Sequence, residues 1–220
     1  RRPGLHHRPQ RGGPEGGRRE ARLRAGHRRR RQGARPRPPE RGRRAHHGAF
    51  GRLDHLVNNA GTNPVFGPIA DLDLNVARKV FETNVISALG LAQKAWHAWQ
   101  KENGGAIVNI ASIAGLAPSP FIGAYGVSKA AMINLTQQLA YEFAPKVRVN
   151  AIAPAVVKTK FAQALYEGRE EEAAAGYPLG RLGVPSDIGG AAAFLTSEQS
   201  DWVTGQTLVV DGGLFLKAGV

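Results

Sequence analysis

AIVNIASIAGLAPSPFIGAYGVSKAAMINLTQQLAYEFAPKVRVNAI (residues 106–152) is the stretch that decides the fold. It opens with an apolar run, Ala106–Ala111, that is typical of a strand covered on both faces. A long helical pattern follows over Tyr125–Phe143, and Pro145 ends it because proline cannot continue a helix. Val147–Ile152 is a second apolar strand. Strand, helix and strand in this order predict a βαβ unit with parallel strands.

The sequence on either side of this unit continues the alternation. The further elements that we expect are a buried strand over Leu53–Asn59, a long helix over Asp71–Asn103, a helix over Pro185–Ser197 and a strand over Thr207–Val210. Asp71 or Asp73 is the expected N-cap of the first helix, because a short carboxylate can accept the free N–H groups there. Together the elements predict an α/β fold with a doubly wound, mostly parallel sheet.

Residues 1–47 differ sharply in composition from the rest of the chain. They hold 17 of the 30 Lys and Arg residues, 3 of the 17 acidic residues, and no Val, Ile, Met, Phe, Tyr or Trp. A segment with so little apolar surface cannot offset its chain entropy by burial, so we expect no packed structure in it. The predicted division is therefore a basic segment, 1–47, and a nearly neutral globular part, 48–220.

Composition also excludes several classes of protein. The chain has no cysteine, so disulfide scaffolds and thiolate metal or catalytic sites are excluded. No apolar run reaches the roughly 18 residues that a membrane-spanning helix needs, and no apolar segment follows the basic start as in a signal peptide. The absence of cysteine fits a reducing compartment, and we expect a cytoplasmic protein.

Three side chains in the globular part suggest acid–base chemistry. Tyr125 and Lys129 are four residues apart in a predicted helix and lie on one face of it, while Ser112 follows the end of a strand. A lysine ammonium favours the phenolate and so lowers a tyrosine pKa, and a nearby hydroxyl can hold a substrate oxygen. The structural alternative is a packed tyrosine beside a solvated lysine.

Two further features have a structural and a functional interpretation. Asn58-Asn59-Ala60-Gly61 follows a predicted strand, where it forms either an ordinary turn or a corner that a ligand approaches closely. Asn84 interrupts an apolar helical stripe formed with Val76, Val80 and Ala88. It is either a core asparagine with a buried partner or one that holds water or bends the helix beside a site.

In this order, these motifs resemble the classical short-chain dehydrogenase/reductases, and the resemblance runs from about Phe50 to Gly213. The family's NNAG is present at 58–61, its helix asparagine is Asn84, and its serine, tyrosine and lysine are Ser112, Tyr125 and Lys129. GRLGVPSDIGGAAAFLTSEQSDWVTGQTLVVDGG (180–213) is similar to the C-terminal signature of bacterial 3-oxoacyl-carrier-protein-reductase-like members. The fold so implied is Rossmann-like.

The resemblance implies an enzyme that interconverts an alcohol and a ketone, with NAD or NADP as cofactor; 3-oxoacyl thioester reduction is one form of this reaction. It implies that Tyr125 exchanges a proton with the substrate oxygen, Lys129 lowers the Tyr125 pKa and binds the nicotinamide ribose, Ser112 orients the carbonyl, and Asn84 holds a water. The implied cofactor-binding residues are Asn58, Ala60, Gly61, Tyr125, Lys129, Pro154, Val157 and Thr159. The sequence departs from the family's PGxxxT at Ala155, where the family has glycine.

The family's first strands and Gly-rich phosphate-binding turn are not recognisable in residues 1–47. We interpret this segment as an out-of-frame or otherwise corrupted reading of a GC-rich gene. We therefore expect the chain as written to bind NAD(P) poorly and to fold poorly. A genuine disordered tail is the alternative. The rival function is a catalytically impaired reductase-like scaffold whose basic arm binds polyanions, although the arm has no aromatic residue for stacking on nucleic acid.

Partners follow from the resemblance as well. The predicted helices carry apolar residues on more than one face, including Trp96 and Trp99, and in the family these helices pair with symmetry mates. We therefore expect a homotetramer or homodimer, and neither a nucleic-acid nor a membrane partner. The segment from about Lys160 to Pro178 includes Phe161, which suggests a partly apolar small-molecule substrate.

Overall fold

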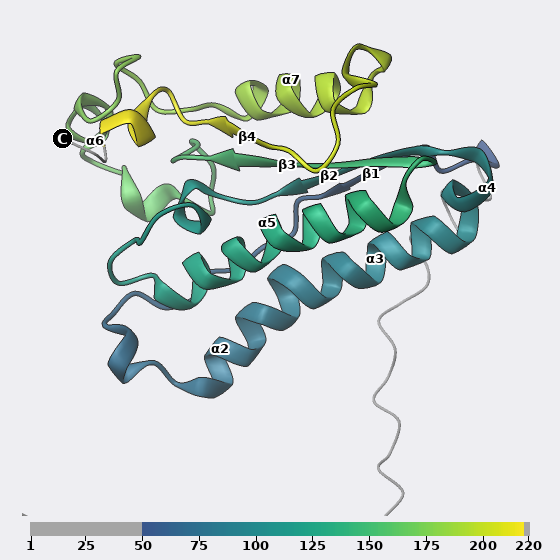
Figure 1. The fold of residues 1–220 in the computed structure, drawn as a ribbon. Coiled ribbons are helices and arrows are strands. Elements are labelled where there is room, and N and C mark those ends of the chain that lie inside the picture. Colours follow the sequence, from purple (N-terminus) through teal and green to yellow (C-terminus); the bar gives the residue numbers. More distant parts are fainter. Residues whose placement is uncertain (1–49, 218–220) are drawn as a thin grey trace, which may run out of the picture. The chain divides into compact units, whose positions relative to one another are not determined.

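The computed structural model describes residues 50–217, and the predicted parallel α/β sheet is confirmed. The predictions for residues 1–47 lie outside these residues. The strands are β1 (His55–Asn58), β2 (Gly105–Ile110), β3 (Val147–Pro154) and β4 (Thr207–Val210). They lie side by side in chain order and every neighbouring pair is parallel, so that their carboxyl ends meet at one edge (Figure 1).

The predicted helix over Asp71–Asn103 is present but interrupted. It consists of α2 (Leu74–Phe81), α3 (Ser87–Ala95) and α4 (Lys101–Asn103), joined by π-helical turns over Glu82–Ile86 and Trp96–Gln100. Asp73 is the N-cap, and its Oδ1 accepts the N–H of Asn75 at 2.8 Å. Asp71 lies in a preceding 3₁₀ turn. π-helical turns are rare and are frequent at functional sites, and the first of these contains Asn84.

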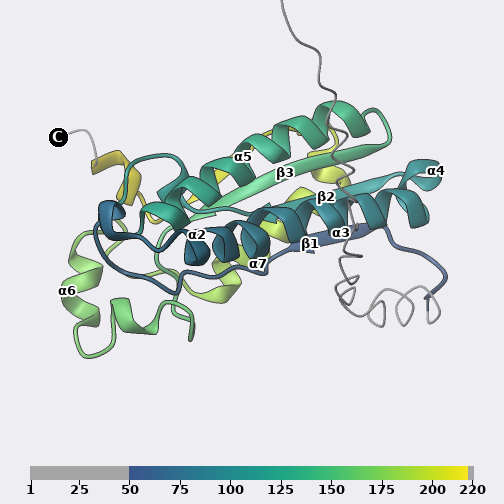
Figure 2. The same cartoon turned by 90° about the horizontal axis from the view of Figure 1, so that it is seen from below.

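Helices cover both faces of the sheet. α3 and α5 (Gly123–Phe143) run next to each other across one face, and α7 (Pro185–Thr196) lies on the other, while α6 (Glu170–Ala175) is set beyond the carboxyl edge (Figures 1 and 2). Two apolar clusters hold these layers. Ile107 and Val149 pack with residues of α3 and α5. Val108 and Ile152 pack with Leu195 of α7. The core thus lies between each helical layer and the central strands β2 and β3.

The prediction that the strand over Leu53–Asn59 is buried is wrong for one face of β1, and β4 is also partly exposed. Val57 is paired with Val108 and therefore points to the α7 face, yet it is 46% exposed. α7 packs against β2, β3 and β4, and β1 is an edge strand of the described sheet. In β4, Leu208 and Val209 are 39% and 38% exposed. The apolar runs in the sequence thus predicted where these strands lie, but not which face of each strand is covered by a helix.

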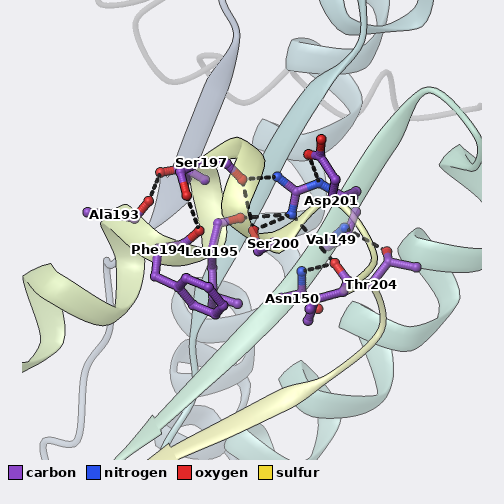
Figure 3. A network of polar contacts seen from close by, with 12 residues as sticks. Val149, Asn150, Ala193, Phe194, Leu195, Ser197, Ser200, Asp201 and Thr204 are labelled. Carbon is purple, nitrogen blue, oxygen red and sulfur yellow. Dashed lines mark hydrogen bonds and ion pairs between the residues drawn. The ribbon is translucent and has the colours of Figure 1, made fainter.

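A network of polar contacts fixes the opposite, amino-terminal edge of the sheet to the end of α7. Arg148 of β3 donates to the carbonyl oxygens of Leu195 and Ser197 and to Ser200 Oγ, at 2.9 to 3.0 Å, and its Nε lies 3.6 Å from Asp201. The acceptors gather around one point beside β3 (Figure 3). A cation at a helix C-terminus satisfies its free carbonyls. These contacts at the amino-terminal edge of the sheet therefore stabilise the fold.

Candidate active site

The predicted serine lies directly beyond the carboxyl end of β2. Ser112 is the N-cap of a 3₁₀ turn, Ile113–Gly115, and its Oγ accepts the N–H of Ala114 at 3.2 Å. Residues at this edge of an open parallel sheet are where α/β proteins place ligands. The turn keeps the hydroxyl at the strand end and leads the chain toward the start of α5.

Close packing of glycines against backbone brings this turn onto α5. A Cβ atom on Gly115 would lie 2.6 Å from the carbonyl carbon of Lys129, and one on Gly126 would lie 2.9 Å from the oxygen of Ala114. Neither gap admits a side chain without a shift. The missing side chains at these two positions therefore allow the serine turn to lie against the helix that carries Tyr125 and Lys129.

Tyr125 is held as a neutral phenol. Burial raises the pKa of Tyr125 above its ordinary value of 10, and a hydrogen bond with the Ser112 hydroxyl acts weakly in the opposite direction. On another side, the ring of Phe161 lies 6.2 Å from that of Tyr125. A neutral phenol can donate a proton, so the side chain is prepared to act as a general acid.

Lys129 is a buried ammonium that has no carboxylate partner within the described residues. It is 3% exposed, its Nζ lies 5.5 Å from the centre of the Tyr125 ring, and it donates to the carbonyl oxygen of Ile110 at 2.6 Å. Burial lowers the pKa of Lys129 from 10.5 to about 8. Lys129 therefore still carries its charge near neutral pH, where it favours the phenolate of Tyr125.

Asn84 is completely buried and its amide is fully used by protein groups. Its Oδ1 accepts the N–H of Thr62 at 2.7 Å, and its Nδ2 donates to the Thr62 carbonyl at 3.1 Å and to Ser128 Oγ at 2.9 Å. Ser128 Oγ in turn donates to the carbonyl of Tyr125 at 2.7 Å. The side chain of Asn84 thus fixes the loop after β1 to the turn of α5 that carries Tyr125, and both of its Nδ2 donors are used by protein groups.

Ser128 was not identified from the sequence, although it directly precedes Lys129. We predict that Ser128→Ala lowers kcat about tenfold with little change in KM, because Asn84 then no longer ties the Thr62 loop to the Tyr125 turn. Ser128→Thr, which keeps the hydroxyl, should restore most of the rate. Steady-state kinetics with Ser128→Ala and Ser128→Thr measure both effects.

Thr136 offers a matched control on the same helix. Its Oγ1 accepts from Asn109 Nδ2 at 2.9 Å and donates to the Met132 carbonyl at 2.9 Å, so it has the same bonding pattern and is also fully buried. Thr136→Ala should lower the melting temperature about as much as Ser128→Ala but leave kcat unchanged. Equal losses of kcat in both variants would show that Ser128 has only a structural role.

The loop after β1 contributes space as well as contacts. Asn58 is buried and its Nδ2 donates to Asn109 Oδ1 at 2.8 Å, while its own Oδ1 is buried with no hydrogen-bond partner among the described residues. Ala60 is exposed, and a Cβ atom on Gly61 would lie 3.5 Å from Lys129 Nζ. The absence of that Cβ leaves the ammonium approachable from the loop side.

The segment after β3 forms the other border of the site. Pro154 ends β3, Val157 forms an isolated parallel bridge with Gly183, and Thr159 Oγ1 donates to the Val157 carbonyl at 3.3 Å. Val157 and Thr159 are half-buried. Backbone and hydroxyl groups are therefore available along one rim of the carboxyl edge. Ala155 is half-buried at the position of the family's glycine.

These groups fit the nicotinamide end of NAD(P). Lys129 Nζ has three N–H bonds, and its hydrogen bond to the Ile110 carbonyl leaves donors for a ribose hydroxyl. Gly61, which has no side chain, lies beside that nitrogen, since a Cβ atom there would be 3.5 Å from it. Thr159 and the backbone at Val157, in the half-buried segment after β3, would offer a hydroxyl and backbone groups to a carboxamide and a phosphate. The described residues are therefore of a kind that would hold one end of such a cofactor.

No group of three or more His, Asp or Glu side chains in residues 50–217 is arranged to hold a metal ion. None of the helices there has the length and apolar character needed to cross a bilayer.

Comparisons with known proteins agree with the geometry. A family model described as "Enoyl-(Acyl carrier protein) reductase" matches residues 42–215. "Dehydrogenase/reductase SDR family member 4" of Caenorhabditis elegans is 40% identical over 171 residues, which cover 75% of this chain and 66% of the relative. The human protein of the same name is 40% identical over 166 residues, which cover 74% and 60%. The chain thus spans less than two thirds of the length of these relatives.

Solved structures give the same result. "ElxO with NADP Bound" superposes with a TM-score of 0.74 and 35% identity, over 80% of this chain and 73% of that one. A short-chain type dehydrogenase/reductase from Mycobacterium ulcerans superposes with a TM-score of 0.75 and 35% identity, over 80% and 65%. At 35% identity, these two structures indicate a shared family as well as a shared fold.

Proposed function

The chain belongs to the short-chain dehydrogenase/reductase family, and from this premise we propose that it is an NAD(P)-dependent oxidoreductase that interconverts an alcohol and a ketone. The observation that carries the proposal is the half-buried Tyr125 with the buried Lys129 one helical turn away and Ser112 beside the phenol. A neutral phenol next to an unpaired buried ammonium suits reversible proton exchange with a substrate oxygen.

In the reductive direction, the Ser112 hydroxyl donates a hydrogen bond that orients the substrate carbonyl, and the Tyr125 hydroxyl gives its proton to the carbonyl oxygen. A reduced nicotinamide, when bound, would supply the hydride that the carbonyl carbon accepts. Tyr125 is left as a phenolate, which the Lys129 ammonium stabilises until a proton returns from solvent. Oxidation of the alcohol follows the same path in reverse, with the phenolate as general base.

For the cofactor, we propose that Lys129 and Tyr125 hold the nicotinamide ribose. The other residues proposed to line the cofactor are Asn58, Ala60, Gly61, Pro154, Val157 and Thr159. For Asn58 the support is indirect, because its side chain faces Asn109 inside the sheet. Two similar structures, of ElxO and of a gluconate 5-dehydrogenase from Burkholderia cenocepacia, contain NADP, so NADP is the cofactor to try first and NAD the second. A 3-oxoacyl thioester is a narrower substrate candidate, consistent with the description of the matching family model.

Turnover tests the proposal directly. The natural full-length protein is incubated with NADPH or NADH and a panel of ketones, aldehydes and a 3-oxoacyl thioester, and oxidation of the reduced cofactor is followed by absorbance. Ketone-dependent oxidation with recovery of the matching alcohol is the expected result. Salt-dependent binding to nucleic acid without turnover of any carbonyl would instead favour the polyanion-binding scaffold. The proposal includes a cytoplasmic location, consistent with the cysteine-free sequence.

We also propose a homotetramer or homodimer. Exposed apolar side chains line α3 and α5, including Leu91 (44%), Val127 (53%) and Tyr141 (87%). Trp96, which the sequence suggested for this contact, instead packs against the core, because its ring stacks on that of Phe143 with ring centres 4.3 Å apart. Sedimentation velocity at micromolar concentration should give a dimer or tetramer, and Tyr141→Glu should shift it toward monomer by placing a charge in the contact. A monomeric wild-type protein would contradict the prediction.

A further inference from the structure

The segment after β3 pairs with Gly183 as a short extended strand. The Val156 carbonyl accepts the N–H of Gly183 at 3.1 Å, and the N–H of Lys158 donates to the Gly183 carbonyl at 2.9 Å. These two bonds form the parallel bridge between Val157 and Gly183. In extended backbone, the N–H and C=O groups of successive residues point to opposite sides, so those of Val157 point away from Gly183. The N–H of Val157 has no hydrogen-bond acceptor among residues 50–217.

Tyr177 continues this pairing where the backbone partner ends. The N–H of Val156 points to the same side as its carbonyl, and it donates to the Tyr177 hydroxyl oxygen at 3.2 Å. A phenol oxygen thus takes the place that a carbonyl oxygen would have in a longer strand. The Tyr177 and Gly183 bonds together hold the peptide groups on both sides of the Val156 Cα. They therefore fix the direction in which the chain enters Val157.

The ring of Tyr177 is held by the turn after β4, but not on every side. Tyr177 is 6% exposed, and a Cβ atom on Gly212 would lie 3.2 Å from its Cδ1, so the glycine leaves room for the ring. The Gly212 carbonyl accepts the N–H of Leu179 at 3.1 Å, which closes the turn onto the segment that follows Tyr177. A cavity of about 200 Å³ remains beside the ring and also borders Val156. Packing alone therefore does not set the position of the hydroxyl, and its bond with the Val156 amide does.

We propose that Tyr177 is a positioning residue, whose hydroxyl holds the Val156 amide so that the unbonded N–H of Val157 meets the carboxamide oxygen of the nicotinamide. The inference rests on the proposed function, in which Val157 lies against that carboxamide. Tyr177 acts through the backbone and not by touching the cofactor. A donor that is oriented in advance binds more tightly, because less conformational freedom is lost on binding. Loss of the hydroxyl should therefore weaken binding of the nicotinamide end and leave the other end of the cofactor unaffected.

Equilibrium binding of two ligands tests this division. NADP⁺ carries the nicotinamide, and the 2′-phosphate of ADP-ribose is the same molecule without that ring. In titration calorimetry of the natural full-length protein, Tyr177→Phe should raise the Kd for NADP⁺ about tenfold, the usual contribution of one hydrogen bond, and leave the Kd for the ring-free ligand unchanged. In turnover, the KM for NADPH should rise by a similar factor with little change in kcat. NAD⁺ and ADP-ribose form the equivalent pair for an enzyme that prefers NAD.

Tyr166→Phe is the matched control, because the Tyr166 hydroxyl also bonds to this segment and donates to the Thr159 carbonyl at 3.3 Å. Any effect of this variant should be the same for both ligands, since Thr159 would meet a phosphate, which both ligands contain. A selective loss of NADP⁺ binding in Tyr166→Phe as large as that in Tyr177→Phe would reject the positioning role, because any loosening of the segment would then suffice.

Two other results reject the inference without touching the proposed function. They are an equal weakening of both ligands by Tyr177→Phe, which indicates a role in the fold alone, and unchanged NADP⁺ binding in that variant, each with carbonyl turnover by the wild type. A wild-type protein that binds neither ligand and turns over no carbonyl would reject the proposed function itself, and the inference with it.

Discussion

Tyr125→Phe is expected to lower kcat by about 10² to 10⁴, the usual contribution of a positioned general acid. The substitution removes only the hydroxyl and keeps the ring, which lies against Lys129 and Phe161. The melting temperature should therefore stay close to that of the wild type. Cofactor binding should weaken only modestly, since Lys129 retains its donors for the ribose.

Tyr141→Phe is the matched control, because Tyr141 lies on the same helix but is 87% exposed. It should leave kcat unchanged. The two variants are compared in steady-state turnover of the best ketone, with the melting temperature and the fluorescence of bound NADPH as checks on folding and binding. If Tyr125→Phe turns over as fast as the wild type, Tyr125 is not the acid and the assignment of the site fails.

The sequence predicted the order and type of the elements well because each carries a strong local pattern. The boundaries of β4 and the start of α7 agree with the prediction to the residue, and α5 begins at Gly123, two residues before the predicted start. Face coverage could not be predicted, because the exposure of Val57 depends on which helix lies over β1 rather than on β1 itself. The π-helical turn at Asn84 likewise depends on tertiary contacts with Thr62 and Ser128.

For the site, residue types and spacing were enough to select Ser112, Tyr125 and Lys129. They could not reveal how the three meet, because that depends on backbone packing at Gly115 and Gly126. Sequence reasoning also missed the strained Phe121. Its position between proline and a helix start gave no sign of a positive φ, which results from a hydrogen bond and a ring contact with the separate 66–67 segment.

Lys129→Met should lower activity strongly while raising stability. We expect kcat/KM to fall about 10³-fold or more, because the phenolate of Tyr125 loses its cation and the ribose its donor. Methionine fills a similar volume without burying a charge, so the free energy of unfolding near neutral pH should rise by roughly 1 to 3 kcal/mol. The lower limit allows for the Ile110 carbonyl, which loses its partner.

The pH dependence of that stability gain identifies its cause. Burial lowers the pKa of Lys129 from 10.5 in the unfolded chain to about 8 in the folded protein. Between these values the unfolded state binds more protons, so the wild type gains stability as the pH rises through this window. The cost of the buried charge is therefore fully present below about pH 8 and is relieved toward pH 10.5.

Urea unfolding measures this difference. Near neutral pH, Lys129→Met should be much more stable than the wild type, and at about pH 10 it should be only slightly more stable. Lys146→Met, at an exposed position, provides the baseline. An advantage of Lys129→Met that is equal at both pH values would mean that packing, not the buried charge, stabilises the variant, and Lys129 would then not be the strained ammonium on which the proposed chemistry depends.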